Sequence, residues 1–185
     1  MSNAVLDRED LRRTLVRIAH EIIERNGGDQ VAMVGIHTRG AVIARRLRKL
    51  VEELIGRPVP LGELDISFYR DDVGARPPSA QPVVHSSRFD FPLEETTVVL
   101  VDDVLYTGRT IRAALDQLID FGRPRRVQLA VLIDRGKEHR ELPIQADYIG
   151  KVVPTKKSEI IKVMLTDFDE EEGVAILERP TTEAS

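Results

Sequence analysis

Val98-Val99-Leu100-Val101-Asp102-Asp103-Val104-Leu105-Tyr106-Thr107-Gly108-Arg109-Thr110 carries the strongest chemical signal in the chain. A buried-type run of β-branched residues leads into two adjacent carboxylates, and a Thr-Gly-Arg-Thr turn then opens a segment with helical spacing. Strand, turn and helix in this order are the repeating unit of an α/β domain. In such domains ligands bind at the carboxyl ends of the strands, so this turn is a candidate binding site.

The residue types of this turn suit a sugar phosphate. Unpaired N–H groups at a helix N-terminus and nearby hydroxyls favour an anion, and Gly108 lets the backbone approach it closely. Asp102 and Asp103 lie a few residues upstream, where carboxylates can accept hydrogen bonds from sugar hydroxyls. A turn that can bind a phosphate, next to carboxylates that can bind two sugar hydroxyls, predicts a site for ribose 5-phosphate.

Three other interpretations of the same stretch are open. It resembles the end of a P-loop, but Asp103 stands where a glycine is expected and Arg109 replaces the lysine. Paired acids also occur in metal-binding phospho-acceptor pockets, usually after the first strand. A helix capped after an ordinary strand accounts for an isolated Thr-Gly-x-Thr. The whole pattern favours the ribose phosphate.

The flanking sequence predicts an α/β domain with a mainly parallel central sheet. Apolar spacing indicates helices over 11–22, with Asp7 as N-cap and Gly27-Gly28 as the end, over 41–55 and over 111–121. Strands are expected over 31–36, 64–68, 97–101, 127–133, 160–165 and 174–177. We expect one domain over 1–185, with about 179–185 as a loose tail.

Composition excludes several classes of protein. The 185 residues are 42% apolar, enough for one core, and 27 basic against 31 acidic residues give a net charge of −4, which excludes a bulk polycation. The absence of cysteine excludes disulfides, thiolate metal sites and a cysteine nucleophile. The longest apolar run is Leu129–Ile133, and no signal peptide precedes the first helix, so a soluble, cytoplasmic protein is expected.

Other polar turns follow predicted strands. His37-Thr38-Arg39-Gly40 follows 31–36, and by itself it is a surface turn with an exposed arginine. Asp134-Arg135-Gly136 ends the strand over 127–133, where Arg135 alone indicates a surface ion pair. The segment 71–82 has no periodicity and several prolines, which by itself is typical of a disordered loop.

Taken together, these motifs resemble those of the type I phosphoribosyltransferases. Val101–Thr110 resembles their phosphoribosyl-pyrophosphate (PRPP) motif, in the form found in bacterial pyrimidine-operon regulators that are also uracil phosphoribosyltransferases. The likeness spans nearly the whole chain, with further blocks at 17–21, 35–40, 65–72, 122–124, 129–136 and 140–143. It implies the type I phosphoribosyltransferase fold, a mainly parallel central sheet flanked by helices, with a flexible hood loop at Tyr69–Asp72 and the prolines that follow.

The resemblance also implies an activity, the transfer of phosphoribose from PRPP to uracil, giving UMP and diphosphate. It assigns catalytic roles to Asp102, Asp103, Arg39 and Arg70, and Mg²⁺ would be held mostly by the substrate. Tyr106 stands where purine enzymes usually have an aspartate, which favours a pyrimidine; hypoxanthine or orotate is the alternative base. Implied contacts to PRPP or UMP are Thr38, Arg39, Asp102, Asp103, Val104, Leu105, Tyr106, Thr107, Gly108, Arg109, Thr110, Arg135 and Ile161.

A second implied function concerns RNA. Arg13, Arg17 and His20 share a helix face that periodicity alone marks as solvated. The resemblance implies binding of the pyrimidine-operon mRNA leader, with UMP as co-repressor, by a dimer or higher homo-oligomer and without DNA or membrane partners. The implied RNA contacts are Arg13, Arg17, His20, Arg25, Thr38, His139, Arg140 and Lys151.

Departures from the family pattern lie mainly on this RNA side. They are Val16, Gln145 and the apparent insertion Lys137-Glu138. A phosphoribosyltransferase without RNA regulation is therefore the alternative, and attenuation and translational block are both open.

Overall fold

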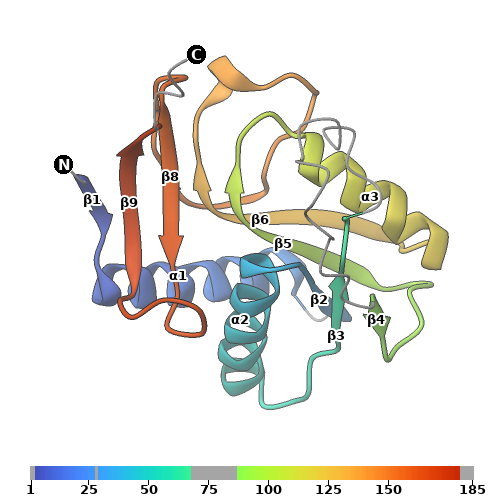
Figure 1. Ribbon diagram of the computed structural model, residues 1–185. Coiled ribbons are helices and arrows are strands. Elements are labelled where there is room, and N and C mark those ends of the chain that lie inside the picture. The colour runs from blue at the N-terminus through green and yellow to red at the C-terminus, as the bar shows by residue number, and fades with distance from the viewer. Residues whose placement is uncertain (1–2, 28, 68–86, 180–185) are drawn as a thin grey trace.

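A computed structural model describes residues 3–27, 29–67 and 87–179, whose largest element is a six-stranded sheet (Figure 1). Strands β3, β2, β5, β6 and β7 lie in this order and run parallel, and β4 pairs antiparallel with β3. This confirms the mainly parallel central sheet. The strand bounds are β2 Val31–Ile36, β3 Leu61–Leu64, β4 Arg88–Phe89, β5 Thr97–Leu105, β6 Arg126–Asp134 and β7 Tyr148–Val152.

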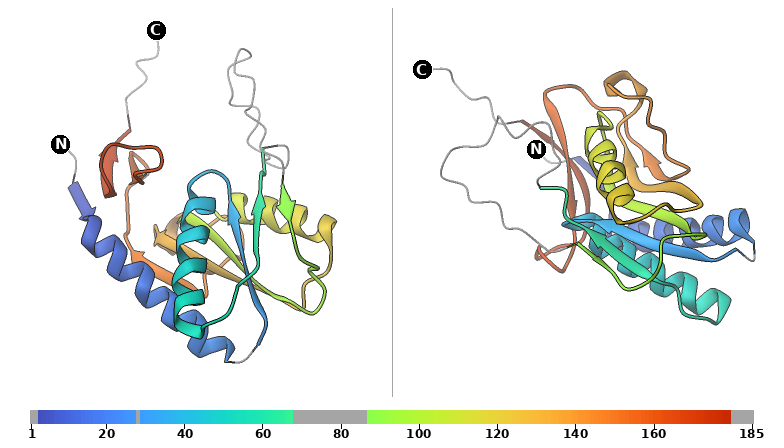
Figure 2. Two further views of the ribbon diagram at one scale, coloured as in Figure 1. Left: turned by 90° about the horizontal axis from the view of Figure 1, so that it is seen from below. Right: turned by 90° about the vertical axis from the view of Figure 1, so that its right-hand side faces the viewer.

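Helices cover both faces of this sheet. Helices α1 (Arg8–Asn26) and α2 (Arg39–Ile55) lie on one face and α3 (Arg109–Phe121) on the other (Figure 2). The predicted start of α1 is confirmed, because Asp7 accepts from the Asp10 N–H in a capping box. Each face closes over its own apolar cluster, so β2, β5 and β6 are buried from both sides and their turns are held rigidly.

A second, three-stranded sheet stands beside the first (Figure 1). Its antiparallel strands are β1 (Asn3–Leu6), β9 (Gly173–Glu178) and β8 (Glu159–Met164), in that order. Apolar side chains of this sheet join the cluster under α1 and α2. The strands at 160–165 and 174–177 were expected from the sequence, but their separation into a sheet of their own was not.

Three details of the sheet prediction were wrong. The strand expected over 64–68 is found earlier in the chain, as β3 at Leu61–Leu64; after Leu64 the Asp65 carboxylate accepts from the Ser67 N–H at 2.9 Å and turns the chain. β5 continues to Leu105, so it contains the acidic pair. β1, β4 and β7 were missed: they are short, and β4 and β7 lie at the edges of the large sheet.

The predicted hood loop lies outside the described residues, except for its approach at 65–67. Among the described residues, no helix is long and apolar enough to cross a membrane.

Candidate active site

The acidic pair lies within β5, between β2 and β6. Asp102 is buried, 6% exposed, and its Oδ1 accepts from the Asp103 N–H at 2.9 Å. Asp103 is half-buried, and its Oδ1 accepts from the Val104 N–H at 2.9 Å. These short-range bonds keep both carboxylates folded back along the strand, beside the turn that follows it.

A pocket of about 400 Å³ opens directly after the pair. The Gly108 backbone, with φ +93°, begins α3, whose first turn carries no acidic residue. Thr107 Oγ1 accepts from the Arg109 N–H at 3.3 Å. The predicted residues Val104, Leu105, Tyr106, Thr107, Gly108, Arg109 and Thr110 all line this pocket, together with Ile111, Glu141 and Arg179. A helix whose first turn has no acidic residue, with hydroxyls and arginines beside it, suits an anion, although Glu141 also lines this pocket.

The turn that begins α2 lies against the acidic pair. A Cβ on Gly40 would meet the Val101 carbonyl oxygen at 2.6 Å and Asp102 Oδ1 at 3.2 Å, so only glycine permits this approach. Thr38, the N-cap of α2, is exposed, accepts no capping bond and follows a cis peptide bond. The structure thus brings the turn at residues 37–40, in which the resemblance to the phosphoribosyltransferases assigns a catalytic role to Arg39, against the predicted ribose carboxylates.

Tyr106 and Arg135 form one unit beside this pocket. The Arg135 side chain is buried under the Tyr106 ring, and its Nε donates to Thr155 Oγ1 at 2.7 Å. Burial lowers the pKa of Arg135 below its ordinary value, since it disfavours the charge. His139 packs on the same tyrosine, with ring centroids 5.1 Å apart. The expected surface ion pair of Arg135 is therefore replaced by an aromatic contact and buried hydrogen bonds.

The segment 137–144 supports the pocket from outside. Arg140 donates to the Tyr106 carbonyl oxygen at 2.6 Å and to Asp134 Oδ1 at 2.8 Å. The Glu141 N–H donates to the Thr107 carbonyl oxygen at 2.9 Å, and the Glu141 carboxylate pairs with Arg109. With its side chain only 10% exposed, Arg140 lies behind the predicted nucleotide site.

The other predicted residues fall into separate places. Ile161 lies in β8 and packs on the cluster under α1 and α2; the Glu159 carbonyl, two residues before it, accepts from Arg135. Arg70 lies outside the described residues. Arg179, at the end of β9, lines the pocket and was missed, because nothing in the sequence links the last strand to residues 104–110.

Two basic residues of α1, Arg17 and Arg25, contact the edge strand β7 or the residue just before it. Arg17 donates to the carbonyl oxygens of Ile149 and Gly150 at 3.2 and 2.6 Å. Lys151 donates to the Val5 carbonyl oxygen at 3.1 Å, and Arg25 pairs with Asp147 at 2.9 Å. Arg13 and His20 are exposed on the same helix. Most of the predicted RNA residues thus form two groups, α1 with β7 in one and His139 with Arg140 in the other. Thr38 lies apart from both groups, at the start of α2.

Comparisons with known proteins agree with this geometry. A family model described as the phosphoribosyl transferase domain matches residues 2–165. The chain is 51% identical over 175 residues to the bifunctional protein PyrR of Bacillus subtilis (strain 168), covering 94% of this chain and 96% of that one. It is 57% identical over 166 residues to bifunctional protein PyrR of Roseiflexus sp. (strain RS-1), covering 89% and 88%.

Solved structures extend the likeness of the fold. The hypoxanthine phosphoribosyltransferase of Trypanosoma cruzi is similar with a TM-score of 0.70 at 17% identity, covering 96% of this chain and 97% of that one. A hypoxanthine-guanine phosphoribosyltransferase of Bacillus anthracis gives 0.67 at 16% identity, with coverage of 95% and 97%. At this identity the likeness concerns the fold alone.

Proposed function

The chain belongs to the phosphoribosyl transferase family and, within it, to the bifunctional PyrR proteins, and from this membership we propose two functions. It is a uracil phosphoribosyltransferase, which converts uracil and PRPP to UMP and diphosphate. It is also a pyrimidine regulator, which binds the mRNA leader of pyrimidine genes when UMP is bound. We expect both functions in the cytoplasm, where the RNA and the nucleotides are found, and we expect the protein to act as a homodimer or higher homo-oligomer.

The observation that carries the enzymatic proposal is the pocket at the start of α3, directly after the acidic pair. Its helix N-terminus, Thr107, Thr110 and Arg109 suit the 5-phosphate of PRPP. Asp102 and Asp103 lie one turn away, where carboxylates can accept from the ribose hydroxyls. The side chains thus match the two ends of a ribose 5-phosphate.

The reaction exchanges one bond at C1′ for another. Uracil N1 forms a bond to C1′ with its electron pair, the bond from C1′ to the diphosphate oxygen breaks, and the N1 proton leaves to solvent. Positive charge develops on the ribose ring as the diphosphate departs, and the Asp102 and Asp103 carboxylates stabilise it. Arg39, at the start of α2, neutralises charge on the departing diphosphate.

The donor set suits a magnesium ion that arrives with the substrate. Asp102 and Asp103 are hard oxygen ligands, and among the described residues no group of three or more acidic, histidine or cysteine side chains comes together. We therefore expect Mg²⁺ to be held mainly by PRPP. When bound, the ion neutralises phosphate charge.

The base is assigned by Tyr106, which lies beside the pocket in contact with Arg135. An aromatic ring there gives uracil a flat neighbour, whereas the family's purine enzymes usually have an aspartate at this position. The alternative base is hypoxanthine or orotate. A radiochemical assay with Mg²⁺, PRPP and each base in turn decides between them. We expect turnover of uracil, and turnover of purines without uracil would overturn the assignment.

The RNA proposal depends on the basic residues of α1 with Lys151. Arg13, Arg17 and Arg25 are paired with exposed or half-buried carboxylates, with side chains 63%, 47% and 51% exposed. Such pairs are worth only about 0–1 kcal/mol, so RNA phosphates can replace the carboxylates at small cost. A phosphoribosyltransferase without RNA binding is the alternative, and the arginine variants described in the Discussion separate the two.

A further inference from the structure

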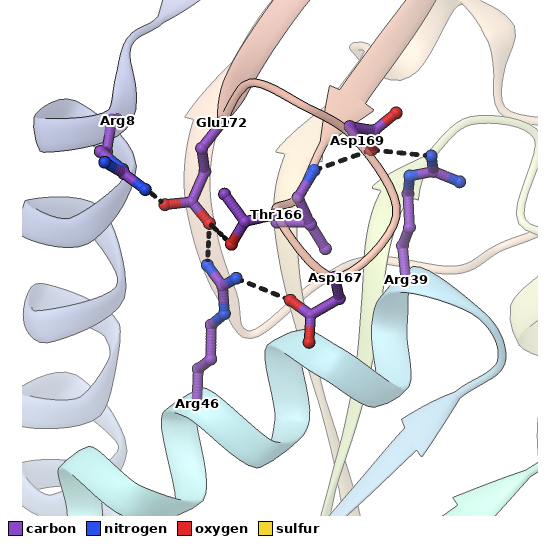
Figure 3. A network of polar contacts seen from close by, with 8 residues as sticks. Arg8, Arg39, Arg46, Thr166, Asp167, Asp169 and Glu172 are labelled. Carbon is purple, nitrogen blue, oxygen red and sulfur yellow. Dashed lines mark hydrogen bonds and ion pairs between the residues drawn. The ribbon is translucent and has the colours of Figure 1, made fainter.

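The turn between β8 and β9, residues 165–172, reaches from the small sheet to α2 (Figure 3). We call it the acidic turn. Arg46 of α2 pairs with Asp167 Oδ2 at 2.9 Å and also with Glu172, and Arg8 of α1 faces Glu172 at 3.5 Å. These pairs fasten the acidic turn to both helices.

The same turn holds Arg39. Arg39 and Arg46 are seven residues apart, so they lie on one side of α2, two helical turns from each other. Arg39 Nε donates to the Val163 carbonyl oxygen at 2.7 Å. Its Nη2 donates to Asp169 Oδ2 at 3.1 Å (Figure 3). Phe168 lies 5.5 Å from the guanidinium and is 50% exposed. These two bonds use two of the five N–H donors of a guanidinium, so an anion can take others.

Asp169 is itself fixed in place. Its Oδ2 also accepts from the Leu165 N–H at 2.9 Å, and the Leu165 carbonyl oxygen accepts from the N–H groups of Phe168 and Asp169 at 2.8 Å each. Leu165 is fully buried, which anchors the turn. The Leu165 amide first, and then Arg39, lower the pKa of Asp169 below its ordinary value. The carboxylate oxygen Oδ2 of Asp169 thus connects the backbone of the acidic turn to Arg39.

We propose that Asp169 is a positioning residue, which holds Arg39 in the orientation that receives the diphosphate of PRPP. The inference builds on the proposed phosphoribosyltransferase activity. An arginine on its own samples many rotamers, and ordering it on binding costs conformational entropy. Asp169 and Val163 order it before the substrate arrives. The turn after Leu165 lies beyond residues 2–165, which the model of the phosphoribosyl transferase domain matches.

The test compares variants of Asp169 in the uracil assay. Asp169→Ala frees Arg39, and we expect the KM for PRPP to rise about tenfold while the KM for uracil changes less than twofold. Asp169→Asn should stay within about threefold of the unmodified enzyme, because one amide oxygen can replace Oδ2 as the acceptor of both bonds. Asp169→Ser, with a shorter acceptor, serves as the second truncation, and thermal unfolding checks that each variant is folded.

Two controls separate positioning from a general effect on the turn. Asp167→Ala removes an acid of the same turn that contacts Arg46 instead of Arg39, and its KM for PRPP should stay within twofold. In an Arg39→Ala background, Asp169→Ala should have no further effect on the KM for PRPP. Any of three outcomes would overturn the proposal: Asp167→Ala raises the KM for PRPP as much as Asp169→Ala does, the effects of Asp169→Ala and Arg39→Ala on this KM add, or Asp169→Ala lowers it.

Calorimetry with inorganic diphosphate and Mg²⁺ gives a reading that does not depend on turnover. We expect Asp169→Ala to weaken diphosphate binding about tenfold. If the unmodified chain forms no UMP, the proposed function fails, and this titration still decides the role of Asp169. Equal diphosphate affinity in both proteins would overturn the role of Asp169 and leave the proposed function untouched.

Discussion

The guanidinium carbon of Arg135 lies 3.8 Å from the centre of the Tyr106 ring. Arg135 is only 4% exposed, and besides the ring it contacts Thr155 Oγ1 and the carbonyl oxygens of Lys156 and Glu159. A buried cation without a carboxylate partner among these contacts depends on carbonyl dipoles and on the aromatic face. Tyr106 therefore has two roles: it lines the proposed nucleotide pocket, and its ring stabilises the buried guanidinium of Arg135.

Replacing this ring should weaken both the fold and the base site. Tyr106→Ala should raise the KM for uracil and lower the free energy of unfolding by about 2 kcal/mol or more, since a desolvated cation–π contact and ring packing are lost. Tyr106→Phe keeps the ring and should stay close to the unmodified protein in both. Steady-state kinetics and urea titrations measure the two effects. A Tyr106→Phe variant as impaired as Tyr106→Ala would contradict the role of the ring.

The acidic pair should be required for turnover and dispensable for folding. Asp102→Asn with Asp103→Asn should lower kcat by a factor on the order of 10² to 10³, as for loss of a transition-state electrostatic contact. The side-chain oxygens of the two asparagines can still accept from the backbone N–H groups of residues 103 and 104. Unfolding should therefore stay cooperative. Stability should change little or rise. Near-normal activity of the double variant would exclude the ribose assignment.

RNA binding should depend on one face of α1. Arg13→Ala or Arg17→Ala should weaken binding to the leader of the chain's own pyrimidine genes, lower the salt slope by about one unit each, and spare UMP synthesis. Arg12→Ala is the matched control, because Arg12 is on the same helix but pairs with Glu9 and borders the groove between α1 and α2. Gel-shift titrations at several salt concentrations provide the measurement.

UMP should tighten the same RNA complex. By linkage, RNA should then tighten UMP binding by the same factor. Gel-shift titrations with and without UMP, and UMP titrations with and without RNA, measure the two factors. No response to UMP and equal behaviour of all three arginine variants would leave an enzyme without RNA regulation.

Acid should release the acidic turn from the helices. Burial raises the pKa of Glu172, but Arg46 and Arg8 outweigh it, so the net pKa lies below the ordinary value of 4.5. A lowered folded-state pKa means that Glu172 stabilises the fold fully above pH 4.5, and that this stability is lost as pH falls through the lowered value. Glu172→Gln should therefore lower Tm at pH 7, by about 2–4 °C per kcal/mol lost. The difference in Tm between Glu172→Gln and the unmodified protein should become smaller toward pH 3, which scanning calorimetry measures. A difference in Tm that does not change with pH would exclude the ion pairs of Glu172 as its cause.

Much of the fold could be predicted from the sequence, because burial on one face or on both leaves a pattern. The helix over 11–22 was found from one apolar stripe and its Asp7 cap, and β2 and β6 from runs buried on both sides. β1 and β7 left no such pattern. They are short, and β7 alternates a buried Tyr148 with the small Gly150, which packs against Thr14 of α1.

The part of the site formed by one continuous segment could be predicted from the sequence, whereas the residues contributed by distant segments were missed. Residues 104–110 are contiguous, so their shared pocket follows from one strand and one turn. Arg179 and Asp169 reach the site through the pairing of β8 with β9, which no local pattern encodes. The sequence shows that His139 and Arg140 are basic but not which way their side chains point. In the structure Arg140 points inward and donates to the Tyr106 carbonyl oxygen.

The pairing of β1 with β9 has a consequence for synthesis of the chain. β1 precedes the other described strands in the chain, and its partner strand β9 follows them. The acidic turn lies immediately before β9, so Arg39 gains its contact with Asp169 only after the strands β1 to β8 have been made. A nascent chain can fold the large parallel sheet while the small one is still unmade. The contact between Asp169 and Arg39 is thus expected to form later than the large sheet, together with the pairing of β9 with β1.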